Sequence, residues 1–312
     1  MAREVAGRTP DADVRLLSNF PARSDAPSEQ RDPRAYRITG DSASHRGDRS
    51  QLSRWLAEFW SFRRTVLPFV ERDVRLKYRR VLIGIVWAAG QPLAFMIIFT
   101  ATLGRTAAGG NSGVSYAALS LAALIGWSYL SSAVSFGANA LHSDAALVRK
   151  VYFPREIPVV GAVLSAFAEL GVGLAVFAAL GPLLGARLTA AWLLIPVLSL
   201  ILVVVATAVA ISLAALNAYY RDFRYVLPFL LQCWLFASPV AYSVDVIPAR
   251  WRSLYLWLNP AAGVLEGFRQ TLALGAMPAP GLLIPSFVGA LVVLLAGYAL
   301  FKRLEPVFVD RF

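Results

Sequence analysis

Long runs of apolar residues alternate with short polar segments between residues 81 and 301. A helix rises about 1.5 Å per residue, so roughly 20 apolar residues cross the hydrocarbon core of a bilayer. The pattern predicts an all-α integral membrane protein with six transmembrane helices. The predicted spans cover about residues 81–104, 114–141, 157–180, 191–216, 226–244 and 282–301.

Between spans five and six, the stretch from about residue 246 to 275 contains two apolar segments that are each too short to span. Asn259-Pro260 separates them. Irregular backbone is tolerated at membrane depth only where protein shields it or where it lines a wet cavity. We therefore predict a re-entrant pair of helices here, rather than a seventh span.

Residues 51–80 precede the first span and differ from it in pattern. Apolar residues recur at helical spacing from Leu52 to Val70, with charged residues opposite them. This pattern is typical of an amphipathic helix in the headgroup plane, which we expect Pro68 to kink or end. Residues 71–80 then form a basic collar, whose plain interpretation is a positive-inside anchor.

Residues 1–50 mix charged residues with Pro, Ser and Gly and show no hydrophobic periodicity. We interpret them as a disordered cytoplasmic tail, with a regulatory or partner-binding role as the alternative. They contain no apolar core that could serve as a secretory signal. The domain organisation is therefore a tail (1–50), an interfacial segment (51–80) and a transmembrane domain (81–312).

Composition agrees with a membrane protein, because 57% of residues are hydrophobic and only 16% are charged. One cysteine, Cys233, excludes an internal disulfide framework and a thiolate metal cluster, and two histidines leave little for a metal site. The formal net charge of +11 could indicate nucleic acid, but the sidedness of the loops explains it better, so no nucleic-acid partner is expected.

Lys and Arg residues distribute unevenly between the two sets of loops. If the N-terminus is inside, thirteen of them flank the spans on the cytoplasmic side. Five lie on the outer side, namely Arg105, Arg187, Arg250, Arg252 and Arg269. The positive-inside rule therefore predicts that both termini are cytoplasmic.

The chain has no Gly-rich phosphate loop of the Walker type and no His-Glu-x-x-His motif. Glu169 is the only carboxylate deep within a predicted span. Such a residue is a functional candidate because its burial is costly, although a bond to a neighbouring helix or a protonated state is the plainer interpretation. Aromatic residues can stack on sugar rings, or can simply anchor helices at the headgroups. The channel-lining candidates are Glu169, Trp87, Tyr116, Trp127, Tyr129, Trp234, Phe236 and Tyr242.

Five segments in order resemble type-2 ABC exporter permeases of the polysaccharide branch, the membrane subunits that export O-antigen, teichoic acid or related glycans. The first is the collar and first span, with RDVRLKYR at 72–79 and QPL at 91–93. The others are VRKVYFPRE at 148–156, NAYYRDFRY at 217–225 leading to SPV at 238–240, NP at 259–260 and EGFR at 266–269. The resemblance covers about residues 52–312 and leaves the tail unmatched.

The resemblance implies a homodimer in the bacterial cytoplasmic membrane, in which each copy binds a separate ATPase subunit that carries ATP and Mg. No cofactor is expected on this chain. It implies that the first cytoplasmic loop, Ser143–Pro154, docks on the ATPase through Asp144, Val148, Arg149, Lys150, Tyr152, Phe153 and Pro154. The helix before span one is expected to gate a polyprenyl-pyrophosphate-linked glycan through Arg72, Arg75, Lys77, Tyr78, Arg79 and Arg80.

The planar guanidinium fork of arginine suits phosphate oxygens, which agrees with that expectation. The alternatives are an ABC permease for a drug or small lipid, which shares the topology, and a membrane-embedded enzyme or scaffold of envelope assembly. An enzyme acting on polyprenyl phosphates would need acidic or histidine residues clustered at a membrane face, and the sequence contains no such cluster.

Overall fold

A computed structural model describes residues 63–78, 81–107, 114–145, 154–220 and 222–311. This part of the chain is helical and contains no strand. The helices are α2 (Arg63–Tyr78), α3 (Val81–Ala107), α4 (Tyr116–Ser143), α6 (Glu156–Ser165), α7 (Phe167–Leu180), α8 (Ile195–Tyr219), α9 (Phe223–Ala237), α10 (Ala249–Leu258), α11 (Pro260–Arg269) and α12 (Pro280–Arg311). Short 3-10 helices lie at Pro182–Leu184, Ala190–Leu194 and Val244–Val246, and a π-helical turn, Gln270–Leu274, extends α11.

Four helical segments are long and apolar enough to cross a membrane: Tyr116–Ser143, Glu156–Leu180, Ala190–Tyr219 and Pro280–Glu305. They coincide with the predicted spans two, three, four and six. Ala88–Gly104 and Phe223–Ala237 are shorter apolar helices, at the positions of predicted spans one and five. The prediction of an all-helical membrane protein is thus confirmed in its coarse form.

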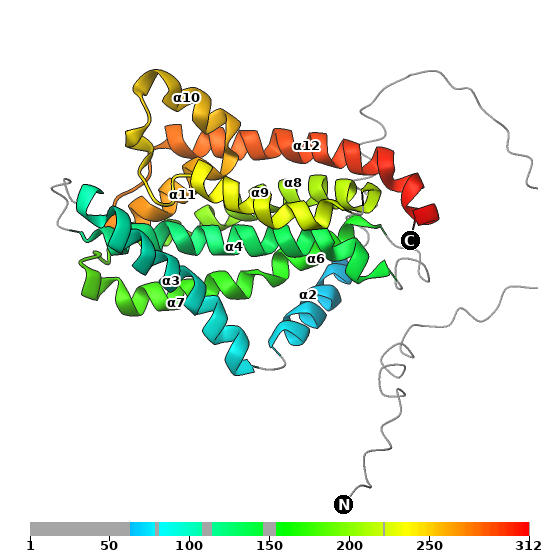
Figure 1. The fold of residues 1–312 in the computed structure, drawn as a ribbon, viewed down its shortest axis with the longest axis horizontal. Coiled ribbons are helices and arrows are strands. Elements are labelled where there is room, and N and C mark those ends of the chain that lie inside the picture. The colour runs from blue at the N-terminus through cyan, green and yellow to red at the C-terminus, as the bar shows by residue number, and fades with distance from the viewer. Residues whose placement is uncertain (1–62, 79–80, 108–113, 146–153, 221, 312) are drawn as a thin grey trace, which may run out of the picture. The chain divides into compact units, whose positions relative to one another are not determined.

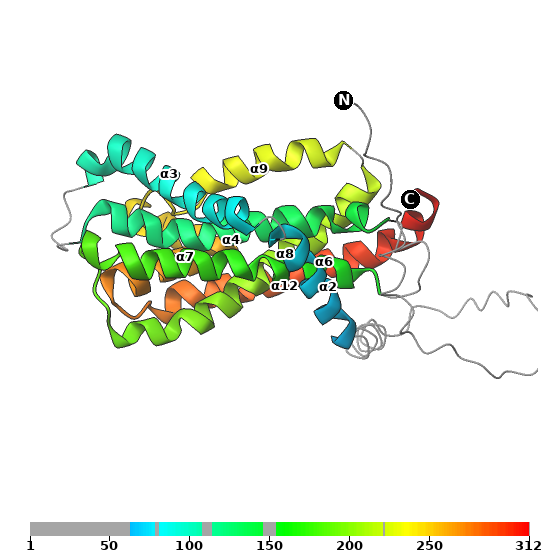
Figure 2. The same ribbon diagram turned by 90° about the horizontal axis from the view of Figure 1, so that it is seen from below.

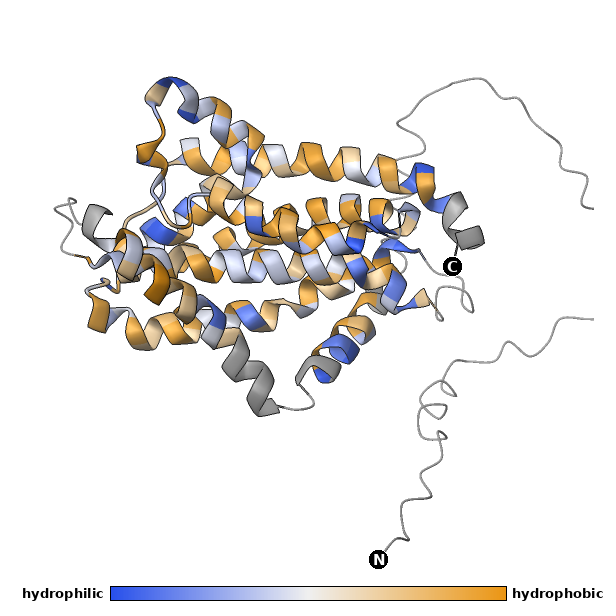
Figure 3. Ribbon diagram, in the orientation of Figure 1, coloured by the Kyte–Doolittle hydropathy of each residue, from blue (hydrophilic) through white to orange (hydrophobic). Residues whose placement is uncertain are grey.

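The long helices run side by side, with α4 in the middle (Figures 1 and 2). Helix α4 packs against α8, α6, α3, α7, α11 and α9, while α12 packs along α8 and α11. One end of the bundle gathers the connections α7–α8, α9–α10 and α11–α12. The other end gathers the end of α4, the start of α6 and the end of α12 (Figure 1). Figure 3 shows apolar residues along the bundle and hydrophilic residues at its ends and on α2 and α10.

Small residues allow α4 and α8 to approach each other closely. A Cβ atom on Gly137 of α4 would lie 2.7 Å from the Cβ of Ala210 in α8. The contact between α11 and α12 is equally close, because a Cβ on Gly263 would overlap the carbonyl oxygen of Leu282. Within a membrane, where apolar burial does not drive helices together, such close packing supplies much of the association free energy.

Two local predictions need correction, and a third is narrowed to one of its alternatives. Of the kink or the helix end expected at Pro68, the helix end is excluded, since α2 continues through Pro68 to Tyr78. Predicted span five ends early: α9 stops at Ala237 because Ser238 and Pro239 begin a buried turn. Arg269, predicted in an outer loop, lies instead in the last turn of α11 and is only 5% exposed.

The predicted break at Asn259-Pro260 is present. Helix α10 ends at Leu258 and α11 begins at Pro260, so two short helices meet at Asn259. The Asn259 side chain accepts a hydrogen bond from the Ala261 backbone N–H and caps α11. Proline suits the first helical position, because the backbone N–H that it lacks has no partner inside the helix.

Candidate functional site

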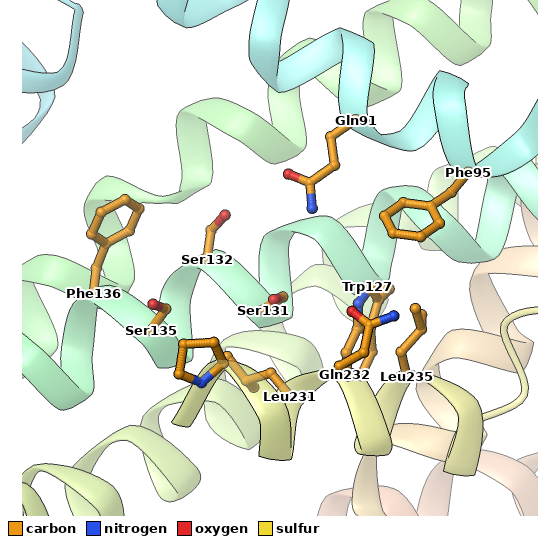
Figure 4. Close-up of a pocket in the computed structure, with 11 residues that line it drawn as sticks. Gln91, Phe95, Trp127, Ser131, Ser132, Ser135, Phe136, Leu231, Gln232 and Leu235 are labelled. Carbon is orange, nitrogen blue, oxygen red and sulfur yellow. The ribbon is translucent and has the colours of Figure 1, made fainter. Parts of the chain in front are cut away.

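A pocket of about 230 Å³ lies between α3, α4 and α9. Polar side chains enter it from all three helices: Gln91 from α3, three serines from α4 and Gln232 from α9 (Figure 4). The serines are Ser131, Ser132 and Ser135, and the apolar lining comprises Phe95, Trp127, Phe136, Pro228, Leu231 and Leu235. Amides and hydroxyls beside aromatic rings offer hydrogen bonds and stacking surfaces to one ligand.

The periodicity of α4 explains how it presents this face. Trp127, Ser131 and Ser135 follow each other at intervals of four residues, so they line up on one side of the helix. Two of the polar residues, Gln91 and Gln232, are exposed in this single chain. An amide side chain facing hydrocarbon finds no hydrogen-bond partner, which is costly. This face is therefore suited to water, a polar ligand or another protein surface rather than lipid.

Aromatic contacts join the pocket to the break at Asn259. The rings of Trp127 and Trp234 meet edge to face, with centroids 5.6 Å apart. The indole N–H of Trp234 donates to the Asn259 side-chain oxygen at 3.0 Å. The Asn259 amide nitrogen donates to the Ser238 hydroxyl at 3.0 Å and to the Ala237 carbonyl at 3.2 Å. Asn259 therefore ties α11 to the end of α9 and, through Trp234, to the pocket wall.

Arg269 holds the turn that follows α9. Its guanidinium donates to the carbonyl oxygens of Pro239, at 2.8 Å, and Val240, at 3.1 Å, and also to that of Tyr242. Its Nε lies 3.6 Å from the carboxylate of the nearly buried Glu266. An unpaired charge at this depth would be very costly, so the three carbonyls and the carboxylate together make the position tenable.

At the opposite end of the bundle, Arg72 of α2 donates to Asp144 Oδ2 at 2.7 Å and to Asp73 Oδ1 at 2.8 Å. Burial lowers the pKa of Arg72, but its hydrogen bonds to Asp144 and Asp73 raise it by more, so the net shift is upward. Burial raises the pKa of Asp73, and Arg72 offsets this rise only in part. Arg75, one turn further on, is exposed and pairs with Glu71 within the same helix.

A second ion-pair group joins the start of α6 to the end of α12. Lys302 Nζ lies 3.2 Å from Glu156 and 3.0 Å from Glu305, and the Tyr298 hydroxyl donates to Glu156 at 2.8 Å. Arg155 donates to the backbone carbonyl of Glu305 at 2.7 Å. Glu156 is only 2% exposed, so its charge depends on these partners.

Comparison with known proteins identifies the architecture. Residues 67–273 match the ABC-2 type transporter family, which covers more than half of the chain. The chain belongs to this family. Membership makes it the membrane subunit of a transporter rather than an enzyme. The match includes α3, α4 and α6 to α11. It thus contains the pocket, the Arg72 group and the second ion-pair group without its α12 residues.

Curated relatives cover most of this transporter subunit. It is 25% identical over 264 residues to the O-antigen export system permease protein RfbA of Myxococcus xanthus, an alignment of 83% of this chain and 99% of that protein. Two RfbA proteins of Klebsiella pneumoniae are 22% and 21% identical over 248 residues, each covering 78% of this chain and 93% of the relative. The resemblance drawn from the sequence motifs is thus confirmed.

Some of the predicted channel-lining residues of the transporter lie at or near the pocket, and others lie away from it. Trp127 lines the pocket, Trp234 packs on it, and Phe236 stacks edge to face on Phe99 at 6.5 Å. Tyr116 begins α4, and its hydroxyl donates to the carbonyl of Ala241 beyond the end of α9. Tyr242 follows the same turn, and its hydroxyl donates to the carbonyl of Phe236.

Tyr129 and Glu169 lie away from the pocket. Tyr129 is fully buried, with its hydroxyl 3.4 Å from the Val163 carbonyl, and Glu169 is half-buried in the first turn of α7. Trp87, Lys77 and Tyr78 lie in helices, but their side chains are outside the described residues, as are Arg79, Arg80 and residues 146–153. Of the predicted ATPase-docking residues, the structure therefore places Asp144 and Pro154.

Two parts of the site were not predicted. Gln232 was not singled out, and Gln91 appeared only in the family-like segment QPL, although an amide within an apolar run is a usable signal. Glu156 appears in the family-like segment 148–156, but its partner Lys302 lies 146 positions away. Nothing in the local sequence connects the two.

Proposed function

We propose that the chain forms half of a dimeric exporter that moves a polysaccharide across the bacterial cytoplasmic membrane. The pocket between α3, α4 and α9 carries the proposal, because its amides, hydroxyls and aromatic rings suit a hydroxyl-rich sugar chain. The relatives are named as O-antigen export permeases, which supports the same class of substrate. A polyprenyl-pyrophosphate carrier would enter beside α2, with Arg75, Lys77, Arg79 and Arg80 near its phosphates.

Six spans underlie this proposal, with α3 as the first and α9 as the fifth. Helix α3 has 27 residues, which at 1.5 Å each are enough to cross the hydrocarbon core. Helix α9 has only 15, so the buried turn at Ser238–Val240 extends the fifth crossing. Helices α10 and α11 then enter and leave on the outer side as the re-entrant pair, shielded by α12 and α4. Both termini lie in the cytoplasm, where the exposed residues of α2 meet the headgroups.

A second copy covers the exposed face of α9. That helix buries only the narrow stripe Leu227, Leu231 and Leu235, whereas Phe229, Gln232 and Phe236 are exposed. The two copies would enclose the polar pockets between them and separate the sugar chain from lipid. A separate ATPase, carrying ATP and Mg, binds the loop Ser143–Pro154 of each copy and drives transport.

Deletion and complementation in the source bacterium test the function. Deletion is expected to remove surface polysaccharide, and the wild-type gene to restore it. Trp127→Ala combined with Gln232→Leu should complement poorly at equal membrane abundance. Trp251→Ala, which removes an exposed tryptophan of α10 away from the pocket, should complement fully. Normal surface polysaccharide in the deletion strain would refute the proposal that the substrate is a polysaccharide. A drug or a small lipid would then remain as the substrate.

The dimer has its own test, because Cys233 is the only cysteine and is exposed on α9. A bifunctional maleimide applied to membranes should join two copies through Cys233, and Cys233→Ser should abolish the product. A chain that stays monomeric under this treatment and in detergent would contradict the pairing through α9.

A further inference from the structure

Helix α2 contacts both ends of the segment that separates α4 from α6. At the start of the segment, Arg72 pairs with Asp144, the residue that caps the C-terminal end of α4. The two residues are 72 positions apart in sequence, and their atoms are 2.7 Å apart. This ion pair thus joins the helix before the first span to the end of the second.

At the other end of the segment, α2 packs on α6. Val66 and Phe69 bury their side chains against Ile157 in a small apolar cluster. Gly161 permits the close approach, since a Cβ there would lie 2.9 Å from the Cβ of Phe69. The face of α2 that the sequence predicted to meet the headgroups is therefore turned, at these two residues, onto protein.

The electrostatics of Arg72 argue against a contact with phosphate. Its Nε and Nη2 donate to Asp73, and Nη2 donates to Asp144 as well. One guanidinium and two carboxylates sum to +1 − 2 = −1, so the trio carries a net negative charge when all three are ionised. A pyrophosphate would be repelled there, and Arg72 could bind it only by giving up two carboxylate partners.

We propose that the Arg72–Asp144 ion pair is a mechanical link through which α2 follows the end of α4 and the start of α6. Arg72 is thus a positioning residue of the export cycle and not a contact for the substrate head. The inference rests on the proposed function, in which the partner ATPase moves the segment between α4 and α6, and α2 gates the substrate. Because α2 is held at Asp144 by charge and at Ile157 and Gly161 by packing, displacement of either end reaches it.

Charge reversal distinguishes the link from a substrate contact. Arg72→Glu and Asp144→Arg, each alone, should lower surface polysaccharide about tenfold while ATP hydrolysis by the purified complex persists. The double variant Arg72→Glu/Asp144→Arg recreates an ion pair of opposite orientation, with Asp73 beside the new arginine. It should restore export to within about twofold of wild type.

Glu71→Gln serves as the matched control, because it also removes a charge from α2 but breaks only an exposed pair within that helix. Arg72→Gln and Asp144→Asn provide neutral versions should a reversed charge lower membrane abundance. These neutral variants should also export less polysaccharide per ATP hydrolysed than Glu71→Gln does.

Three results would overturn the link: single variants that export normally, a double variant as defective as Arg72→Glu, or ATP hydrolysis that falls in parallel with export. A double variant that stays defective, beside a normal Asp144→Asn, would assign Arg72 to the substrate head instead. Failure of the proposed function is recognised separately, since the deletion strain would then keep its surface polysaccharide.

Discussion

The contact between α4 and α8 at Gly137 gives a quantitative test of the fold. A Cβ on Gly137 would lie 2.7 Å from the Cβ of Ala210 and 3.1 Å from Cγ2 of Val163. Non-bonded carbons prefer about 3.5–4.0 Å, so Gly137→Ala must push α4 and α8 apart by about 1 Å. Ala210 has no rotamer that could relieve the clash, and the backbone must therefore move.

Overpacking of this kind costs about 1–3 kcal/mol. Replacing glycine by alanine also favours a helix by roughly 1 kcal/mol, which would mask part of the cost. Gly171→Ala is the matched control, because Gly171 lies in α7 with no other atom within 4 Å of the added Cβ. Both variants gain the same helix propensity, so the difference between them measures the clash.

The assay is thermal unfolding of the detergent-purified protein, followed by its tryptophan fluorescence at one heating rate. A cost of 1–3 kcal/mol at about 2–4 °C per kcal/mol puts Gly137→Ala roughly 2–12 °C below Gly171→Ala. Equal melting temperatures would show that α4 and α8 do not meet closely at this position. Gly137→Leu should widen the gap, since its side chain is larger still and meets the same neighbours, Ala210 and Val163.

Three further changes can be followed in the same assay. Lys302→Met leaves Glu156 buried without its cation and should cost about 3–5 kcal/mol, most of which Glu156→Gln should recover in the double variant; no recovery would mean that Lys302 acts only by packing. Asn259→Ala removes the cap of α11 and the bond from Trp234, so a loss of about 2 kcal/mol is expected, with Asn259→Ser intermediate; equal stability of both variants would contradict a capping role. Burial raises the pKa of Asp73 in the folded protein above its value in the unfolded chain. The stability that this carboxyl group contributes is therefore present below the unfolded pKa and is lost as the pH rises through the folded pKa. Asp73→Asn should therefore raise the melting temperature at pH 7 and change it less at pH 4, and the reverse order would refute this sign.

The long helices could be predicted from sequence because each depends on a local property, an apolar run free of charge. The break at Asn259-Pro260 was equally local, since Asn caps a helix and Pro begins one. The early end of α9 was not, because apolar residues continue beyond Ser238 and hydropathy alone cannot distinguish a helix from a buried turn. The predicted fifth span was therefore too long at its C-terminal end.

The candidate site was predictable only in part. Trp127 and Trp234 were visible as aromatic residues within apolar runs, but their contact with each other depends on how α4 and α9 pack. The pairs Arg72–Asp144 and Glu156–Lys302 join residues 72 and 146 positions apart. The sequence shows which residues are charged but not which of them pair. The basic collar was therefore interpreted as a set of equivalent exposed cations, although Arg72 is paired with Asp144.

The buried guanidinium of Arg269 has a consequence for how the protein is made. An arginine in a membrane-embedded helix disfavours insertion, by up to roughly 2.5–3.5 kcal/mol when it lies at the helix centre. Its three carbonyl acceptors belong to residues 239–242, which leave the ribosome about 30 residues earlier. The stretch from α9 to the π-helical turn therefore contains the hydrogen-bond acceptors that stabilise this charge. We expect it to enter the lipid as one block during translation, with the arginine already covered.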